Sequence, residues 1–301
     1  MMPRLLVLAG ASGTGKSELG IMLAERLGGE VVNADAMQLY RGMDIGTAKT
    51  PPAERRGVPH HLLDVLHVTE TASVAAYQQQ ARALIERLLA AERMPILVGG
   101  SGLYIQAVID EMSFPGTDPD VRRRYLQLVA ERGPERMHGE LRSLDPTAAA
   151  TILPTDGRRI ARALEVRELT GNPFTATLPA RGPARYDALI LTVDRPTAQL
   201  DVRLAERVDA MMAAGFLDEV RGLLDAGLRR GTTARRALGY SQLIDVVDGK
   251  RSVEQAVTDT VTGTRRLVRR QRSWFRRDPR RHDLDAADPG LLDAALALLR
   301  S

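Results

Sequence analysis

Four short apolar runs mark the chain, and stretches with helical spacing lie between them. Runs of Leu, Val and Ile of this length are typical of buried strands. They cover residues 5–9, 30–35, 95–98 and 187–193. Helical spacing follows the first run and again covers residues 71–92. The pattern predicts an α/β fold, with a parallel sheet flanked by helices.

The pattern changes after Phe114-Pro115-Gly116, where only helical spacing remains. We expect helices over about 118–131, 134–143, 146–152 and 156–170, with Gly171 and Pro173 as a helix stop. Residues 116–185 are therefore predicted to form an all-helical insertion, and residues 1–115 and 186–301 the α/β core. The rest of the core is predicted to be helical, with helices near 196–214, 217–226, 252–277 and 291–299.

The first apolar run leads directly into a glycine-rich segment with the spacing G-x-x-x-x-G-K-S. The segment consists of Gly10, Ala11, Ser12, Gly13, Thr14, Gly15, Lys16 and Ser17. Strand, loop and helix in this order form a phosphate-binding loop (P-loop), whose free N–H groups and helix dipole attract an anion. Lys16 is expected to reach the outermost phosphate and the Ser17 hydroxyl to bind Mg²⁺. The alternative is a glycine-rich turn that matches by chance.

Asp35 ends the second predicted strand, at the sheet edge where ligands bind in α/β folds. A single carboxylate there is a candidate general base or magnesium ligand, and the alternative is a capping role. A second glycine-rich turn, residues 99–104, follows the third strand and includes Ser101. Two such turns would frame one pocket, although the second could equally be a tight connection without a ligand.

Composition limits the classes of protein that remain. The 301 residues contain no cysteine, which excludes disulfides, thiolate nucleophiles and cysteine zinc sites. No apolar segment is long enough to span a membrane, and no signal peptide is recognised, so we expect a cytoplasmic protein. His60-His61 has no carboxylate at metal-ligand spacing, and we expect no metal there.

Arginine is concentrated near the C-terminus, between residues 265 and 281. Six of these arginines flank an apolar stripe on one predicted helix: Arg265, Arg266, Arg269, Arg270, Arg272 and Arg276. A basic block of this kind indicates a polyanionic partner. We expect neutralisation of Arg269, Arg270 and Arg272 to weaken binding of a nucleic acid; the alternative is a solvated helix face.

Four segments carry a resemblance to a known family: residues 35–49, 99–104, 159–165 and 264–275. In order and spacing they resemble the tRNA dimethylallyltransferases, and the similarity extends from Gly10 to about Arg277. The resemblance implies transfer of a dimethylallyl group from dimethylallyl diphosphate to N6 of the adenosine 3′-adjacent to the anticodon of a tRNA. The absence of cysteine resembles the bacterial form, since eukaryotic relatives carry a zinc finger. We expect a monomer.

The resemblance also implies roles for particular residues. Asp35 is the general base, with Lys16, Ser17 and Ser101 beside it, and Mg²⁺ is held at Ser17. The P-loop holds the diphosphate of the donor, together with Arg203, Arg207 and Arg236. The residues implied in tRNA binding are Asp35, Ala36, Met37, Gln38, Ser101, Arg123, Arg159, Ile160, Ala161, Arg162, Ala163, Arg269 and Arg270. Ala36 stands where the family usually has Ser, and Ser101 where it has Thr.

Two other functions also fit the motifs. A small-molecule P-loop kinase would close an arginine lid over ATP, for which Arg122–Arg124 are candidates. An RNA-binding module with a vestigial P-loop would bind tRNA regardless of diphosphate.

Overall fold

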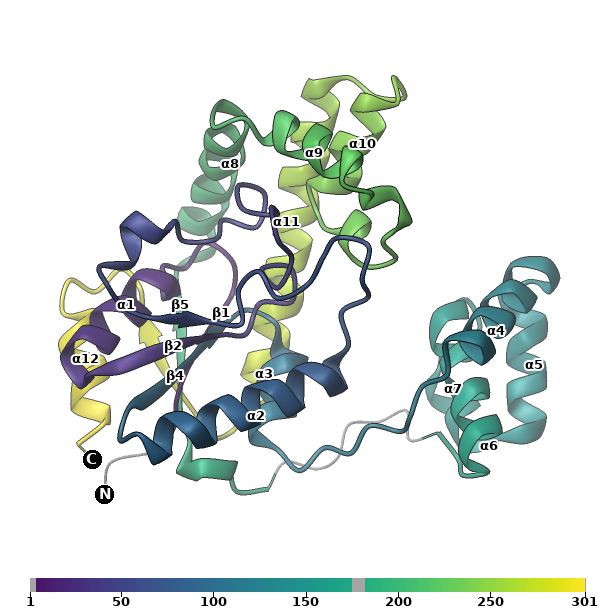
Figure 1. Ribbon diagram of the computed structural model, residues 1–301, viewed down its shortest axis with the longest axis horizontal. Coiled ribbons are helices and arrows are strands. Elements are labelled where there is room, and N and C mark those ends of the chain that lie inside the picture. Colours follow the sequence, from purple (N-terminus) through teal and green to yellow (C-terminus); the bar gives the residue numbers. More distant parts are fainter. Residues whose placement is uncertain (1–3, 175–181, 301) are drawn as a thin grey trace. The chain divides into compact units, whose positions relative to one another are not determined.

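The computed structural model describes residues 4–174 and 182–300. Residues 1–3, 175–181 and 301 lie outside this part, and with them a section of the predicted insertion. In the part described, one parallel sheet has the strand order β3-β2-β4-β1-β5-β6 (Figure 1). The strands are β1 (Leu6–Gly10), β2 (Gly29–Asn33), β3 (His60–His61), β4 (Met94–Gly99), β5 (Leu189–Asp194) and β6 (Arg281–Asp285). The predicted parallel sheet flanked by helices is confirmed.

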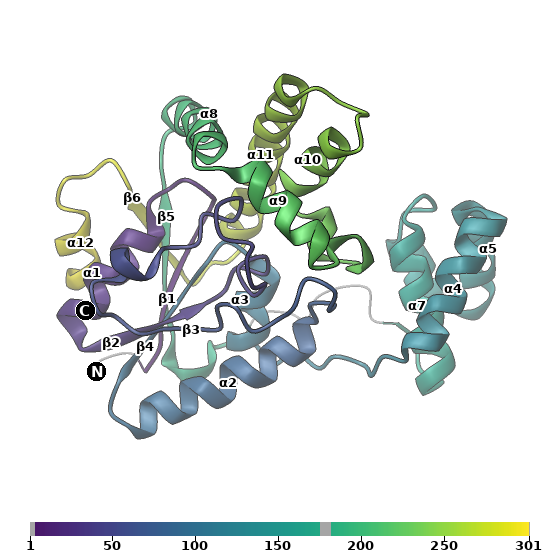
Figure 2. The same cartoon turned by 45° about the horizontal axis from the view of Figure 1, so that its top comes forward.

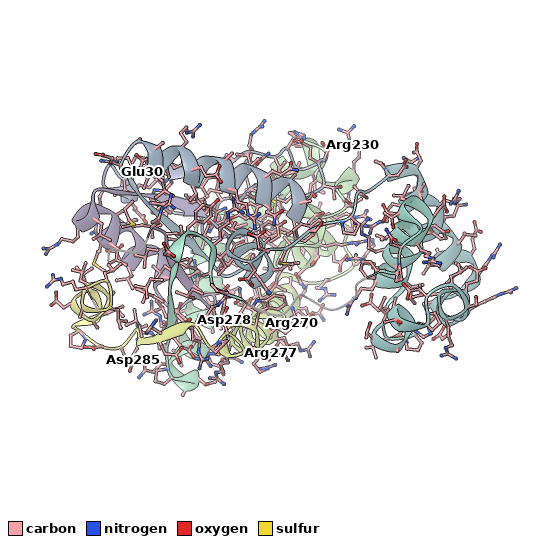
Figure 3. All side chains as sticks on the ribbon, turned by 90° about the horizontal axis from the view of Figure 1, so that it is seen from below. Glu30, Arg230, Arg270, Arg277, Asp278 and Asp285 are labelled. Carbon is pink, nitrogen blue, oxygen red and sulfur yellow. The ribbon has the colours of Figure 1, made fainter. Side chains whose placement is uncertain are left out.

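The two edge strands, β3 and β6, were not predicted from the sequence. β3 is only two residues long, and β6 has the sequence Arg-His-Asp-Leu-Asp, of which only Leu284 is buried (Figure 3 labels Asp285 at its end). Charged side chains are common on edge strands, which need no apolar partner on their outer side. Strands of this kind contain no apolar run, so the pattern used for the prediction does not detect them.

Alternation along the central strand β1 assigns helices to both faces of the sheet. Val7 and Ala9 pack with α2 (Val74–Ala90) and α3 (Gly102–Ile109), whereas Leu6 and Leu8 pack with α1 (Lys16–Leu27) and α12 (Leu291–Leu298). Successive side chains of a strand point to opposite faces, so an all-apolar strand is buried on both sides.

The C-terminal helices lie side by side beyond the carboxyl ends of the strands (Figures 1 and 2). They are α8 (Thr197–Ala213), α9 (Phe216–Asp225), α10 (Tyr240–Val247) and α11 (Val253–Arg276). Short 3₁₀ turns occur at η1 (Pro52–Arg55), η2 (Arg185–Asp187), η3 (Leu228–Arg230) and η4 (Ala234–Arg236). Ser252 caps α11 in a reciprocal pair with Gln255, a capping box that fixes where the long helix begins.

A separate compact unit, Glu111–Gly182, is inserted between the two parts of the α/β unit, Met1–Asp110 and Pro183–Ser301. Its helices are α4 (Pro119–Arg132), α5 (Pro134–Leu144), α6 (Pro146–Thr151) and α7 (Gly157–Thr170). Proline begins three of them, and an aspartate caps three of them, which explains why their limits are readable in the sequence. Met137, Leu141, Ile160 and Leu164 belong to the core of this unit.

Candidate functional site

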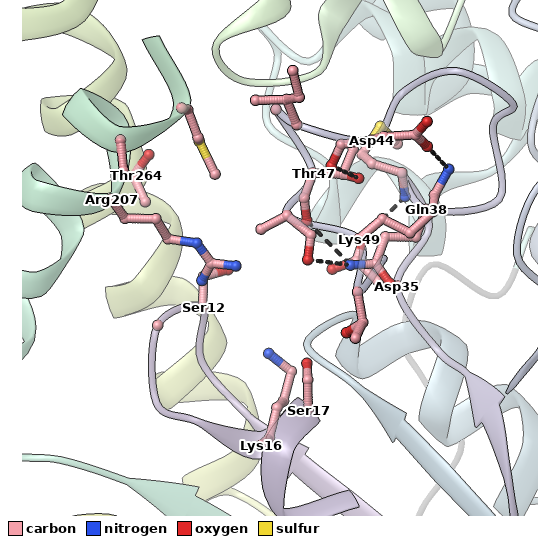
Figure 4. A pocket seen from close by; sticks show the side chains of 18 of the residues that line it. Ser12, Lys16, Ser17, Asp35, Gln38, Asp44, Thr47, Lys49, Arg207 and Thr264 are labelled. Atoms are coloured by element: carbon pink, nitrogen blue, oxygen red, sulfur yellow. Dashed lines mark hydrogen bonds and ion pairs between the residues drawn. The ribbon is translucent and has the colours of Figure 1, made fainter. Parts of the chain in front are cut away.

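A pocket of about 1030 Å³ opens at the carboxyl ends of β1, β2 and β4 within the α/β unit. Its lining comes from the P-loop, the loop that follows β2, and helices α8 and α11 (Figure 4). The pocket therefore lies where ligands bind in open parallel sheets. Lys16, Arg207 and Asp35 all point toward its interior (Figure 4).

The P-loop joins β1 to α1 with the geometry of an anion site. Gly13 and Gly15 have φ of +83° and +96°, a left-handed backbone that favours glycine. Gly15 precedes α1 and supplies no side-chain cap, which leaves the first amides of the helix to a ligand. Ser12, Gly13, Gly15, Lys16 and Ser17 line the pocket, and the hydroxyl of Thr14 donates to the carbonyl of Ala11 below it.

Lys16 lies in a site that disfavours its charge. Burial lowers the pKa of Lys16 to about 8, while Asp35 raises it and Arg207 lowers it further. Its ammonium donates to the Ala11 carbonyl at 3.4 Å. A polyanion in the pocket would offset this desolvation, so the pocket is matched to a phosphate-bearing ligand.

Arg207 reaches the same pocket from α8, one helical turn after Arg203. Burial lowers the pKa of Arg207, against the effect of Asp35, and Arg203 lowers it as well. Arg203 is more exposed and also lines the pocket. Arg236, which we expected to bind the diphosphate, is exposed on η4 and is not a lining residue, so the structure does not place it at the diphosphate site.

Asp35 is held by its own strand end. Asn33 accepts a hydrogen bond from the Asp35 amide at 2.9 Å and donates to its carbonyl at 3.0 Å. The Asp35 Oδ1 accepts from the amide of Met37 at 3.0 Å. In residues 4–174 and 182–300 no hydrogen bond is made to its other carboxylate oxygen. That oxygen is therefore available to a ligand in the pocket.

Ser101 forms hydrogen bonds with the backbone on both sides of Asp35. Its Oγ accepts from the Ala36 amide at 3.1 Å, and its own amide donates to the Ala34 carbonyl at 3.2 Å. Met37 and Gln38 line the pocket, whereas Ala36 and Ser101 do not. Ser101 thus contacts the backbone that carries Asp35, and because its hydroxyl accepts in this bond, its O–H is left to donate; its predicted role toward substrate stays a prediction.

The buried Lys49 and the half-buried Gln38 hold the loop over residues 44–49 in place, and the sequence did not reveal these contacts. The buried Lys49 ammonium donates to the Tyr40 carbonyl at 2.9 Å and pairs with the carboxylates of Asp44 and Asp64. Lys49 thereby ties this loop to the segment that follows β3. Gln38 donates to the carbonyl of Thr47 at 3.1 Å (Figure 4).

Glu219 of α9 binds the same loop from the other side. Its carboxylate accepts from three consecutive amides, those of Asp44, Ile45 and Gly46, at 3.0, 2.7 and 3.2 Å. The hydroxyl of Tyr240 adds a fourth bond, at 2.6 Å. Glu219 and the loop amides are about 175 residues apart in the chain, so the spacing of residues in the sequence gave no sign of this contact.

In the insertion, the residues predicted to bind tRNA divide into two groups. Arg123 and Arg159 are exposed. Ile160, Ala161 and Ala163 are fully buried, so their side chains are closed to an RNA, and their predicted part in tRNA binding stays a prediction for the backbone alone.

Arg162 is also committed to the interior of the insertion. It donates to the carbonyls of Pro115 and Gly116 at 2.7 and 3.1 Å and pairs with the buried Glu165 at 2.9 Å. We therefore correct its predicted role from tRNA binding to fixing the start of the unit. The candidate lid arginines pair within the same unit: Arg122 with Glu165, Arg123 with Asp120, and Arg124 with Glu168.

The basic helix α11 shows a similar division. Arg269 and Arg270 are exposed, and Arg270 is labelled in Figure 3. Arg272 instead pairs with Asp194 at 2.7 Å and donates to Thr197 at 2.8 Å. It joins α11 to the end of β5, which corrects the expectation that it binds a nucleic acid.

Oxygen groups that can bind a hard cation are present in the pocket. Ser17 and Asp35 offer a hydroxyl and a carboxylate. Among the described residues no group of three or more His, Asp or Glu side chains could hold a metal ion. The pair suits Mg²⁺, which takes one or two protein oxygens and completes its shell with phosphate and water. His60 and His61 instead contact the Val58 carbonyl and Glu30.

Comparison with known proteins gives a consistent result. The family model described as "IPP transferase" matches residues 38–278. A tRNA dimethylallyltransferase of Nocardia farcinica is 59% identical over 294 residues, covering 98% of this chain and 94% of that protein. In the part of the chain that the structure describes, no helix is long and apolar enough to cross a membrane.

Solved structures extend the similarity to the fold. The tRNA isopentenylpyrophosphate transferase of Bacillus halodurans is 35% identical with a TM-score of 0.72, covering 98% of this chain and 96% of that one. A eukaryotic dimethylallyltransferase acting on tRNA has a TM-score of 0.81 at 27% identity, covering 98% of this chain and 76% of that one.

Proposed function

The chain belongs to the IPP transferase family, and from this membership and the pocket we propose that it transfers the dimethylallyl group of dimethylallyl diphosphate to N6 of the adenosine 3′-adjacent to the anticodon of a tRNA. One observation carries the proposal. Two desolvated cations, Lys16 and Arg207, share a pocket with the carboxylate of Asp35 (Figure 4). The cations suit a diphosphate, and the carboxylate suits the proton of an attacking amine.

The reaction forms one bond and breaks one. The N6 lone pair attacks the allylic C1 of the donor, and the bond between C1 and the bridging oxygen breaks with its electrons moving onto diphosphate. Asp35 accepts the proton that N6 loses, as a general base. The P-loop amides, Lys16 and Arg207 stabilise the negative charge that grows on the leaving oxygens.

Magnesium completes the charge balance of this site. We propose Ser17 as its hydroxyl ligand, with phosphate oxygens and water completing its coordination shell. When bound, the ion would neutralise part of the diphosphate charge.

Exposed arginines on two units are the proposed grip on the tRNA backbone. Arg269 and Arg270 lie on α11 of the α/β unit, and Arg123 and Arg159 lie on the insertion. Phosphate contacts of this kind release counterions, so binding should weaken steeply as salt increases. The target adenosine must leave its stack to reach the pocket, as bases do in enzymes that modify them.

Mass spectrometry of the RNA product tests the proposal. The protein is mixed with Mg²⁺, dimethylallyl diphosphate and an anticodon stem-loop that has adenosine after the anticodon. We expect one dimethylallyl group on that adenosine, a rate of product formation about 100-fold lower with Asp35→Asn, and wild-type yield with the exposed control Asp225→Asn. Phosphate transfer from ATP, with no gain of mass on stem-loop or full-length tRNA, would favour a kinase instead.

A further inference from the structure

The turn after β4, residues 99–102, has three glycines that are required by close packing. A Cβ at Gly99 would meet the Ala34 carbonyl at 2.2 Å, and one at Gly100 would meet Nε2 of Gln271 at 2.5 Å. At Gly102 it would meet the ring of Trp274 at 2.2 Å. None of the three has positive φ, so space rather than backbone conformation demands glycine. This turn is therefore a packing surface for α11 and the end of β2.

Gln271 of α11 uses both halves of its side-chain amide to join two loops. Its Oε1 accepts from the Ser12 amide of the P-loop at 3.0 Å, and its Nε2 donates to the Gly100 carbonyl at 3.0 Å. An amide is planar and its two ends differ chemically, so this pair of bonds fixes the orientation of the side chain.

The chain of contacts continues from Gly100 to the carboxylate side of the pocket. The next residue, Ser101, bonds the backbone of Ala34 and of Ala36, on either side of Asp35. Gln271 thus links the phosphate-binding loop, through one turn, to the segment that carries Asp35.

Helix α11 is anchored well enough to serve as the fixed point of this link. Phe275 is buried in the core formed with α2 and α3, and Trp274 packs at its edge. Arg272 joins the helix to Asp194 at the end of β5. The helix around Gln271 is therefore held in place by the protein itself and does not depend on a ligand in the pocket.

We propose that Gln271 is a positioning residue, which sets the separation between the diphosphate held by the P-loop and the Asp35 carboxylate. The inference rests on the proposed function, because that separation determines how C1 of the donor meets the amine that loses its proton to Asp35. Reacting atoms must lie close to their attack distance, and a displacement of about 1 Å can cost roughly 100-fold in rate. Gln271 itself need not touch either substrate.

The first test replaces Gln271 by methionine, which keeps the length and loses both hydrogen bonds. We expect the single-turnover rate to fall by about 10- to 100-fold. The dissociation constants of the stem-loop and of pyrophosphate should change by less than about threefold. Gln80→Met, the same substitution on the exposed face of α2, is the matched control and should behave as wild type. A rate within twofold of wild type would overturn the proposal, and so would a stem-loop affinity that falls by the same factor as the rate.

A second variant approaches the link from the other side. Gly100→Ala places a methyl group 2.5 Å from Nε2 of Gln271 and 3.2 Å from the carbonyl oxygen of Gly10, at a residue that has no positive φ. It should reproduce the loss of rate, and the double variant should lose little more than either single one, since both break one connection. Losses that multiply in the double variant would contradict a shared role.

Hydrogen exchange separates failure of this inference from failure of the proposed function. In Gln271→Met the amides of residues 10–17 and 99–104 should both exchange faster, whether or not the protein transfers a dimethylallyl group. Unchanged exchange in either segment would overturn the link. Faster exchange in both, with no product from the wild type, would overturn only the proposed reaction.

Discussion

Replacing Lys16 by methionine is expected to stabilise the fold while it strongly reduces activity. Burial lowers the pKa of Lys16 from 10.5 to about 8. Each pKa unit corresponds to about 1.4 kcal/mol, so in the protein alone the charged form costs about 3 kcal/mol relative to the unfolded chain. This is an upper value, because the side chain is partly exposed at the pocket. Methionine has a similar length and no charge to desolvate.

The sign of the effect follows from the two pKa values. Below about pH 8 Lys16 is charged in both states and the full cost is present. The cost declines as pH increases from 8 to 10.5 and vanishes above that range, where the amine is neutral in both states. Lys16→Met should therefore raise the free energy of unfolding by about 3 kcal/mol at pH 7 and by less than about 1 kcal/mol at pH 10.

Equilibrium unfolding in urea, followed by fluorescence, measures this difference. The chain has one tryptophan, Trp274, which packs against the turn after β4 and so reports on the α/β unit. Dimethylallyl transfer by the variant should fall by about 100-fold or more, since a donor to the leaving group is lost. Equal or lower stability at pH 7, or a gain that is the same at both pH values, would refute the reasoning.

Three further predictions follow from the other charged sites. Asp35→Asn should lower transfer by about 100-fold with stem-loop affinity retained, and unchanged turnover in a rapid-quench assay would make Asp35 structural. The double variant Arg269→Ala/Arg270→Ala should reduce the slope of log affinity against log salt concentration by about 2. Filter binding between about 50 and 200 mM salt measures this slope, and an unchanged slope would mean that the RNA binds elsewhere. Glu165→Gln removes the carboxylate that pairs with Arg122 and Arg162 and should destabilise the insertion by about 3 kcal/mol. Limited proteolysis should then cut the insertion faster, while the unfolding transition reported by Trp274 fluorescence is unchanged. A shift of that transition by the same amount would mean that the two units unfold together.

The sequence alone predicted those helices, strands and loops that form because of residues close together in the chain. The strand, loop and helix at residues 6–27 follow from an apolar run, glycines at positive φ and a helical period, all within one short segment. The insertion helices are marked by Pro and by capping Asp, which act within one turn. Lys16 and Asp35 were placed at the pocket because parallel strands end at one edge of a sheet.

Tertiary structure alone decided what depends on partners distant in the chain. The burial of Ile160 and the commitment of Arg272 to Asp194 depend on which helix face meets the core, and a basic or motif-like sequence does not specify that. Glu219 binds amides more than 170 residues away in the chain, and Gln271 binds the amide of Ser12, which is 259 residues away. A side chain's type shows which bonds it can make, but only the packed fold brings the matching atoms within reach, because backbone donors and acceptors carry no signature in the sequence.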